Sequence, residues 1–214
     1  GSMSERPVDA RLYLVAPSRL AVGTLAELVP ELAAAGVDLI QLREKEMEAG
    51  DILRVGEPLA AACEEARVPF IVNDRPDVAF ALRASGVHLG TNDLPTSIAR
   101  AILGPAIVGR SSHSRDDIDA ALDGSPDYLA VGPVYATPTK PDRPGTGLEL
   151  IAHAAATVSI PWFAIGGIND SNLEQVLGAG AARIVVVRAI TEAPDPPSAA
   201  ARLKAMLRFA TTTP

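Results

Sequence analysis

Short apolar runs rich in Val, Ile and Leu alternate along this chain with longer Ala- and Leu-rich stretches. Short apolar runs are typical of buried strands, whereas apolar residues three or four positions apart, as in Leu25, Leu28 and Leu32, are typical of helices. Eight strands are predicted, each followed by a helix, at residues 11–16, 37–42, 69–73, 86–90, 106–110, 127–132, 161–166 and 183–188. The pattern therefore predicts eight consecutive strand–helix units.

Start and stop residues agree with this division. The predicted N-caps are Thr24, Asp51 and Ser171, and the glycines predicted to follow helix ends are Gly36, Gly86 and Gly180. Eight alternating units predict an α/β protein with a single-domain (β/α)8 TIM barrel over residues 3–214. A doubly wound open sheet is the competing fold, but no Gly-rich dinucleotide turn follows the first strand. Gly1-Ser2 before Met3 is typical of a tag remnant.

Composition narrows the class of protein. The 214 residues are 48% hydrophobic and 21% charged, as expected for one well-packed globular domain. The net charge of −7 argues against a nucleic-acid partner, although a local basic cluster can still bind small phosphorylated molecules. Cys63 is the only cysteine, so a reducing compartment and a cytoplasmic location are expected. No apolar run is long enough for a membrane span.

Polar residues gather at the ends of the predicted strands. Gln41, Arg43 and Lys45 alternate with Leu42, so their side chains share one face of a strand. Arg43 and Lys45, together with Lys140, form a candidate anion-binding cluster. The alternative is a solvated charged face, because glutamates alternate with these cations. In a (β/α)8 barrel the active site is formed by functional groups at the carboxyl ends of the parallel strands.

Asp74 and Asp93 end the third and fourth predicted strands. Neighbouring strands lie about 4.8 Å apart, so both carboxylates can reach one cation. Two carboxylates that leave room for water and a substrate phosphate describe a Mg²⁺ site, one ion per active site. Taken singly, each Asp also suits a helix cap or a turn before a proline.

Two further segments carry candidate chemistry. Gly166-Gly167 after the seventh strand and Val187-Arg188 after the eighth fit a phosphate cradle, although a plain tight turn is the alternative. The Pro- and Gly-rich segment 136–147 is predicted to be a mobile lid. His88 is interpreted as a hydrogen-bonded core residue, whereas His113 lies nearer the catalytic face.

Together these motifs resemble the thiamine phosphate synthase family over nearly the full length of the chain. They are Gln41-Leu-Arg-Glu-Lys45, Asn73-Asp-Arg75, Val87-His-Leu-Gly90 with Asp93, Gly109-Arg-Ser111, Asp127-Tyr128 with Gly132-Pro133, Thr137-Pro-Thr-Lys140, Ile165-Gly-Gly-Ile168 and Val187-Arg-Ala-Ile190. The resemblance implies a transferase that joins hydroxymethylpyrimidine diphosphate to thiazole phosphate, or its carboxylated form, and releases diphosphate with Mg²⁺.

The resemblance also implies a role for each matching residue. Asp74 and Asp93 would hold Mg²⁺, and Arg43, Lys45, Ser111 and Lys140 would act in catalysis. The pyrimidine diphosphate would bind Gln41, Leu42, Arg43, Glu44, Lys45, Asn73, Ser111 and Lys140. The thiazole phosphate would bind Thr137, Pro138, Thr139, Gly167, Val187 and Arg188. Other members often carry Ser at position 188, so a backbone N–H contact would survive in this chain but a hydroxyl contact would not.

Three other functions are alternatives to the synthase. A thiazole tautomerase would use His113 as acid and base but would not need the Asp74–Asp93 pair. A phosphate-binding barrel that has lost its chemistry would be expected to carry substitutions at Arg43, Asp74 or Lys140, and none is seen. Another phosphate-binding barrel enzyme, such as one of tryptophan biosynthesis, would not explain these cations beside two strand-end carboxylates. The expected partners are small phosphorylated substrates, with no nucleic acid or membrane, and the expected assembly is a homodimer.

Overall fold

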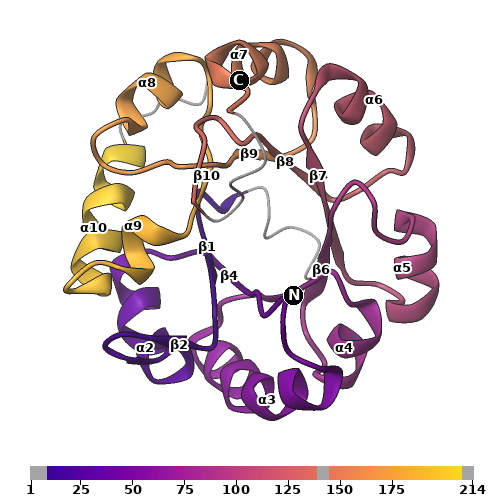
Figure 1. Cartoon of the computed structure of the whole chain (residues 1–214), viewed down its shortest axis with the longest axis vertical. Coiled ribbons are helices and arrows are strands. Elements are labelled where there is room, and N and C mark those ends of the chain that lie inside the picture. The colour runs from indigo at the N-terminus through magenta and orange to yellow at the C-terminus, as the bar shows by residue number, and fades with distance from the viewer. Residues whose placement is uncertain (1–8, 139–144, 209–214) are drawn as a thin grey trace.

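A computed structural model describes residues 9–138 and 145–208. Within them, eight parallel strands close into a barrel in the order β1-β10-β9-β8-β7-β6-β5-β4 (Figure 1). The barrel strands are β1 (Leu12–Ala16), β4 (Leu39–Leu42), β5 (Phe70–Asn73), β6 (Gly86–Leu89), β7 (Ile107–Ser112), β8 (Tyr128–Val131), β9 (Trp162–Ala164) and β10 (Ile184–Val186). The predicted (β/α)8 barrel is therefore confirmed, and the open sheet is excluded because β1 pairs with both β4 and β10.

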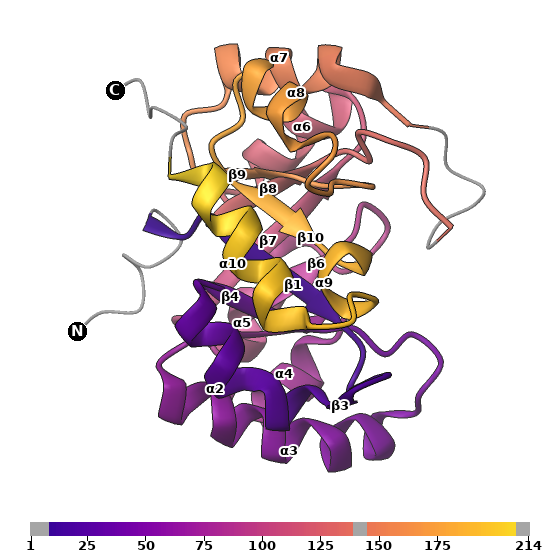
Figure 2. The same ribbon diagram turned by 90° about the vertical axis from the view of Figure 1, so that its left-hand side faces the viewer.

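Helices surround this barrel as an outer layer. They are α2 (Leu25–Ala35), α3 (Ala49–Ala66), α4 (Pro76–Ala81), α5 (Thr96–Leu103), α6 (Arg115–Asp123), α7 (Gly147–Thr157), α8 (Leu173–Gly178), α9 (Arg188–Thr191) and α10 (Pro196–Leu207). A small hairpin of β2 (Arg19–Leu20) and β3 (Gly23–Thr24) lies with α9 at the end toward which the barrel strands run (Figure 2). No helix in the described part of the chain combines the length and apolar character needed to cross a membrane.

The alternation of side chains along each strand creates two separate apolar cores. Ile40 and Leu42 of β4 face outward into the large core between barrel and helices. A smaller core fills the barrel interior and includes Tyr13, Tyr128 and Phe163. Inward-facing residues near the carboxyl ends of the strands, such as Gln41, therefore lie at the mouth of the barrel.

The structure confirms two of the predicted helix boundaries and corrects two others. Thr24 caps α2 through a hydrogen bond to the Glu27 N–H, and Gly36 ends that helix with φ 113°, as predicted. Asp51 is not an N-cap, because α3 already begins at Ala49. Ser171 is not one either, since Asn172 holds that position before α8.

Two boundary predictions also change. Gly86 does not follow a helix end but opens β6, where an added Cβ would lie 2.0 Å from the Ile107 carbonyl oxygen. The backbones of β6 and β7 can approach closely there because residue 86 has no side chain. The fifth barrel strand, β7, extends to Ser112, so Ser111 lies within the strand rather than after it. The backbone of Ser111 is consequently fixed by its pairing with β8 and does not belong to a loop.

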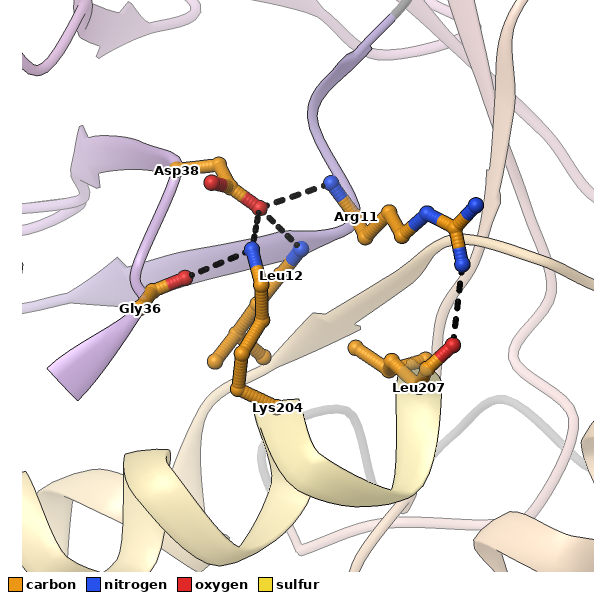
Figure 3. A network of polar contacts seen from close by, with 6 residues as sticks. All are labelled: Arg11, Leu12, Gly36, Asp38, Lys204 and Leu207. Atoms are coloured by element: carbon orange, nitrogen blue, oxygen red, sulfur yellow. Dashed lines mark hydrogen bonds and ion pairs between the residues drawn. The ribbon is translucent and has the colours of Figure 1, made fainter. Parts of the chain in front are cut away.

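A polar network joins α10 to the amino ends of strands β1 and β4 (Figure 3). The Asp38 carboxylate accepts hydrogen bonds from the backbone N–H groups of Arg11 and Leu12 and from Lys204 Nζ on α10. Lys204 also donates to the Gly36 carbonyl oxygen. One carboxylate thus joins β1, the start of β4 and α10, where the chain closes on itself.

Candidate active site

A cleft of about 630 Å³ opens at the carboxyl ends of the barrel strands. This volume lies in the range of small-molecule binding sites. Most of the predicted site residues line it: Gln41, Arg43, Lys45, Asn73, Asp74, Asp93, Ser111, Thr137, Pro138, Gly167, Val187 and Arg188. The closed barrel therefore brings together groups that are far apart in the sequence.

Two of the predicted residues that the structure describes, Leu42 and Glu44, do not line the cleft. Leu42 is buried in the outer core, and the Glu44 carboxylate accepts hydrogen bonds from the backbone N–H and hydroxyl of Ser18. Neither side chain points toward the site, because both alternate with inward-facing positions. Thr139 and Lys140, with residues 141–144 of the predicted lid at 136–147, lie outside the described residues.

The end of β4 delivers two cations to one side of the cleft. Arg43 is half-buried, and this burial lowers the pKa of its guanidinium while the Asp74 charge acts in the opposite sense. Lys45 is more exposed, and its Nζ atom lies 2.8 Å from Oδ2 of Asp74. The half-buried guanidinium of Arg43 and the more exposed ammonium of Lys45 can together bind an anion that has several oxygens.

Two carboxylates face one another beside these cations. Burial acts to raise the pKa of Asp74, but hydrogen bonds with Lys45 and Asp93 outweigh it and hold that pKa below its usual value. Burial and the contact with Asp74 raise the pKa of Asp93, although the Gly90 N–H donates to Oδ2 of Asp93 at 2.6 Å. The opposite shifts show that the two carboxyl groups lie close enough to interact, and a divalent cation held between them would offset their mutual repulsion.

This donor set fits a Mg²⁺ ion held largely by its substrate. Nowhere among the described residues do three or more His, Cys, Asp or Glu side chains gather in a group that could hold a metal ion. Mg²⁺ is commonly bound by one or two carboxylates plus waters and substrate phosphates, so a pair suffices. The backbone of Asp74 has φ 65°, a conformation that Asp tolerates better than most residues.

Glycines and backbone groups form the opposite side of the cleft. Gly166 and Gly167 have φ 110° and 68°, and a Cβ on Gly166 would lie 2.4 Å from Cα of Pro133. The turn therefore requires glycine at both positions. Arg188 makes a two-bond ion pair with Glu192, each bond 2.9 Å long, so its guanidinium is directed along α9.

Both histidines near the site are engaged in hydrogen bonds. His88 bonds through Nδ1 to the Tyr128 hydroxyl and through Nε2 to Ser111 Oγ. The interpretation of His88 as a hydrogen-bonded core residue is confirmed. His113 lines the cleft and donates from Nδ1 to the Gly132 carbonyl oxygen at 2.7 Å.

Sequence reasoning missed Tyr13, which lies in the barrel interior and also lines the cleft. Tyr13 lies inside the run Leu12-Tyr-Leu-Val-Ala16, which indicates only a buried strand. Its hydroxyl bonds to Gln41 at 2.8 Å and to Tyr128 at 2.7 Å. The only indication in the sequence was the tyrosine itself, whose hydroxyl needs a hydrogen-bond partner when it is buried in an otherwise apolar strand.

A closed parallel barrel with a polar cleft at the carboxyl ends of its strands defines a (β/α)8-barrel enzyme. The sequence model of one family, thiamine monophosphate synthase, matches residues 12–190. The chain belongs to that family.

Relatives match over almost the whole chain. The thiamine-phosphate synthase of Acidothermus cellulolyticus is 50% identical over 205 residues, covering 94% of this chain and 97% of its own length. That of Thermobifida fusca is 50% identical over 210 residues, with 96% of each chain covered. Among solved structures, the thiamine phosphate pyrophosphorylase of Pyrococcus furiosus superposes with a TM-score of 0.85 at 34% identity, covering 94% of this chain and 96% of that one.

Proposed function

We propose that this protein is a thiamine phosphate synthase that condenses hydroxymethylpyrimidine diphosphate with thiazole phosphate, or its carboxylated form, and releases diphosphate. The observation that carries the proposal is the juxtaposition of Arg43 and Lys45 with the facing carboxylates Asp74 and Asp93 in one cleft. A diphosphate with its Mg²⁺ needs cations and carboxylates side by side, whereas a monophosphate site needs only donors. Membership in the family supports the same reaction.

The pyrimidine diphosphate would occupy the side of the cleft formed by β4 to β7. Arg43 and Lys45 would bind its phosphate oxygens, while Gln41, Asn73 and Ser111 would orient the rest of the molecule. Asp74 and Asp93 would hold Mg²⁺, which when bound neutralises charge on the diphosphate. Lys45 would exchange Asp74 for a phosphate oxygen, because an exposed ammonium on a flexible stem reorients at little cost.

The thiazole phosphate would occupy the opposite side. The turn at Gly166–Gly167, together with Val187 and Arg188, would supply backbone N–H groups to the phosphate, and Thr137 and Pro138 would contact the ring. A backbone contact at position 188 does not use the guanidinium, which is already paired with Glu192. The Arg at this position is therefore compatible with the proposed site.

In this reaction the protein has to position the two rings and to stabilise the negative charge of the leaving diphosphate. The pyrimidine amino group can push electrons toward departure of diphosphate, and the neutral thiazole nitrogen then attacks the methylene carbon. No general base is needed for that attack. Arg43, Lys45 and Ser111, with Lys140 from outside the described residues, would stabilise the leaving group, and the two subsites would align the rings.

We also infer a cytoplasmic location and a homodimeric assembly. The single cysteine, fully buried in α3, supports a reducing compartment. Exposed Phe80 on α4 and Ile98 and Ile102 on the neighbouring helix α5 offer apolar surface for a second copy. Light scattering of the purified protein would give twice the 22.2 kDa chain mass for the dimer and the chain mass itself otherwise.

The reaction itself is tested with purified protein, Mg²⁺ and both substrates, with each substrate omitted in turn. The proposal predicts thiamine phosphate only when both are present. A folded protein that binds thiazole phosphate but forms no thiamine phosphate would overturn it. If the protein instead converted the thiazole to its tautomer, the result would favour a thiazole tautomerase that uses His113 as acid and base.

A further inference from the structure

A continuous chain of five hydrogen-bonding groups crosses the barrel interior and reaches the cleft at both ends. Gln41 Nε2 donates to the Tyr13 hydroxyl at 2.8 Å, and the Tyr13 and Tyr128 oxygens are 2.7 Å apart. The Tyr128 hydroxyl lies 2.9 Å from His88 Nδ1, and His88 Nε2 lies 2.8 Å from Ser111 Oγ. Gln41 and Ser111 both line the cleft.

The Gln41 end sets the direction of the whole chain. A phenol carries a single proton, so Tyr13, which accepts from the Gln41 amide, can only donate onward to Tyr128. Tyr128 must in turn donate to His88 Nδ1. His88 is then protonated on Nε2 and donates to Ser111 Oγ. Because Ser111 Oγ accepts inside the barrel, its own proton is left to donate to a molecule in the cleft.

The surroundings keep the two tyrosines neutral and hold their rings in place. Burial raises the pKa of both tyrosines above the ordinary phenol value, so each keeps its proton. Phe163 packs edge-on against both rings at centroid distances of 5.3 Å and 5.4 Å. Gly109 leaves space for Tyr128, since a Cβ there would lie 2.0 Å from Cζ of that ring.

We propose that Tyr128 is a positioning residue for the reaction: through His88 it orients the Ser111 hydroxyl as a hydrogen-bond donor toward a substrate oxygen that gains negative charge as the leaving group departs. Such a donor stabilises the transition state more than the bound substrate, so its loss lowers kcat more than it changes KM. The kinetic part of this inference rests on the proposed function, whereas the direction of the hydrogen-bond chain does not.

The tautomer of His88 is read by ¹⁵N NMR of the histidine rings in the substrate-free protein. The chain has three histidines, so the signals are assigned by replacing His113 and His153 in turn. The proposal predicts that His88 in the wild-type protein carries its proton on Nε2. A proton on Nδ1 would mean that the chain runs in the opposite direction and would overturn the proposal.

Two matched variants separate this role from a packing role. Tyr128→Phe removes the hydroxyl that donates to His88, and the proposal predicts a mixture of His88 tautomers and a kcat lower by about 10- to 100-fold, with KM within about threefold. Tyr13→Phe removes an equally buried hydroxyl but leaves Tyr128 its acceptor on His88. Because the hydrogen bond between Tyr128 and His88 remains in this variant, it should lower kcat by clearly less.

A double-mutant cycle tests whether Tyr128 acts through Ser111. Adding Tyr128→Phe to Ser111→Ala should lower kcat by less than about twofold, because the donor being oriented is already gone. Equal losses from Tyr13→Phe and Tyr128→Phe, or full additivity with Ser111→Ala, would overturn the proposal. A wild-type protein with the predicted tautomer but no diphosphate release would instead count against the proposed function alone.

Discussion

Nζ of Lys45 lies 2.8 Å from Oδ2 of Asp74, which joins the ends of β4 and β5 inside the cleft. Asp74 in turn contacts Asp93, so one ammonium and two carboxylates share a small volume. In the absence of a ligand the Lys45 ammonium offsets part of this negative charge. In the proposed complex, Mg²⁺ would offset the charge of the two carboxylates and Lys45 would bind a phosphate oxygen instead.

Asp74→Asn should therefore lower kcat/KM by at least about 100-fold and raise the Mg²⁺ concentration needed for half-maximal rate. Asn keeps the size of the side chain and tolerates the positive φ at this position, so the fold should persist. The measurement is diphosphate release against Mg²⁺ concentration. Asp77→Asn is the control, because Asp77 is exposed and paired with Arg75 outside the cleft; a similar loss in both variants would contradict the account.

Lys204→Met should destabilise the protein without changing its turnover. Lys204 donates to Asp38 and to the Gly36 carbonyl oxygen, and its removal leaves a partly buried carboxylate short of its cation. We expect the free energy of unfolding to fall by about 2 kcal/mol in urea titration. Arg202→Met on the exposed face of the same helix should change it by less than about 0.5 kcal/mol. Equal stability of both variants would show that this network does not fasten α10.

Gly109→Ala tests the packing between β7 and the Tyr128 ring. An added methyl group would lie 2.0 Å from Cζ and 2.3 Å from the hydroxyl oxygen of Tyr128, in a core with no room to yield. We expect the midpoint of thermal unfolding to fall by several degrees and the rate of diphosphate release to fall with it. Gly50→Ala in α3 is the control, since nothing lies within 4 Å of its added Cβ. It should leave stability equal or slightly higher.

Cys63 should be unreactive in the native protein. It is fully buried, and this burial raises the pKa of its thiol to about 12. Only the thiolate reacts with disulfide reagents, and at pH 8 it would be about one part in ten thousand. The thiol should therefore be modified by Ellman's reagent only as fast as the protein unfolds, and immediately in denaturant. Rapid modification of the native protein would contradict the described packing of α3.

The barrel could be predicted from sequence because each strand and helix has a strong local pattern. Gln41 between Ile40 and Leu42 already indicated which face of β4 looks inward, and the structure confirms it. Asp51 and Ser171 were wrong as N-caps because several polar residues near each helix start suit that role, and the backbone geometry decides among them.

The hydrogen-bond chain across the barrel could not be predicted in the same way. Tyr13 and Tyr128 are 115 positions apart, and each lies in an apolar run that indicates only a buried strand. Their contact depends on the closure of the barrel, which brings β1 and β8 to opposite sides of one interior. The motif around His88 indicated a core histidine but not the partners that give it a direction.

The most direct test of the central claim is to measure diphosphate and thiamine phosphate together, with both substrates present, first with Mg²⁺ and then with EDTA. The account predicts that the two products appear in equal amounts, and that EDTA abolishes both while the protein stays folded. Diphosphate released without an equal amount of thiamine phosphate, or an equal rate in EDTA, would contradict the assignment of this cleft to a metal-assisted condensation.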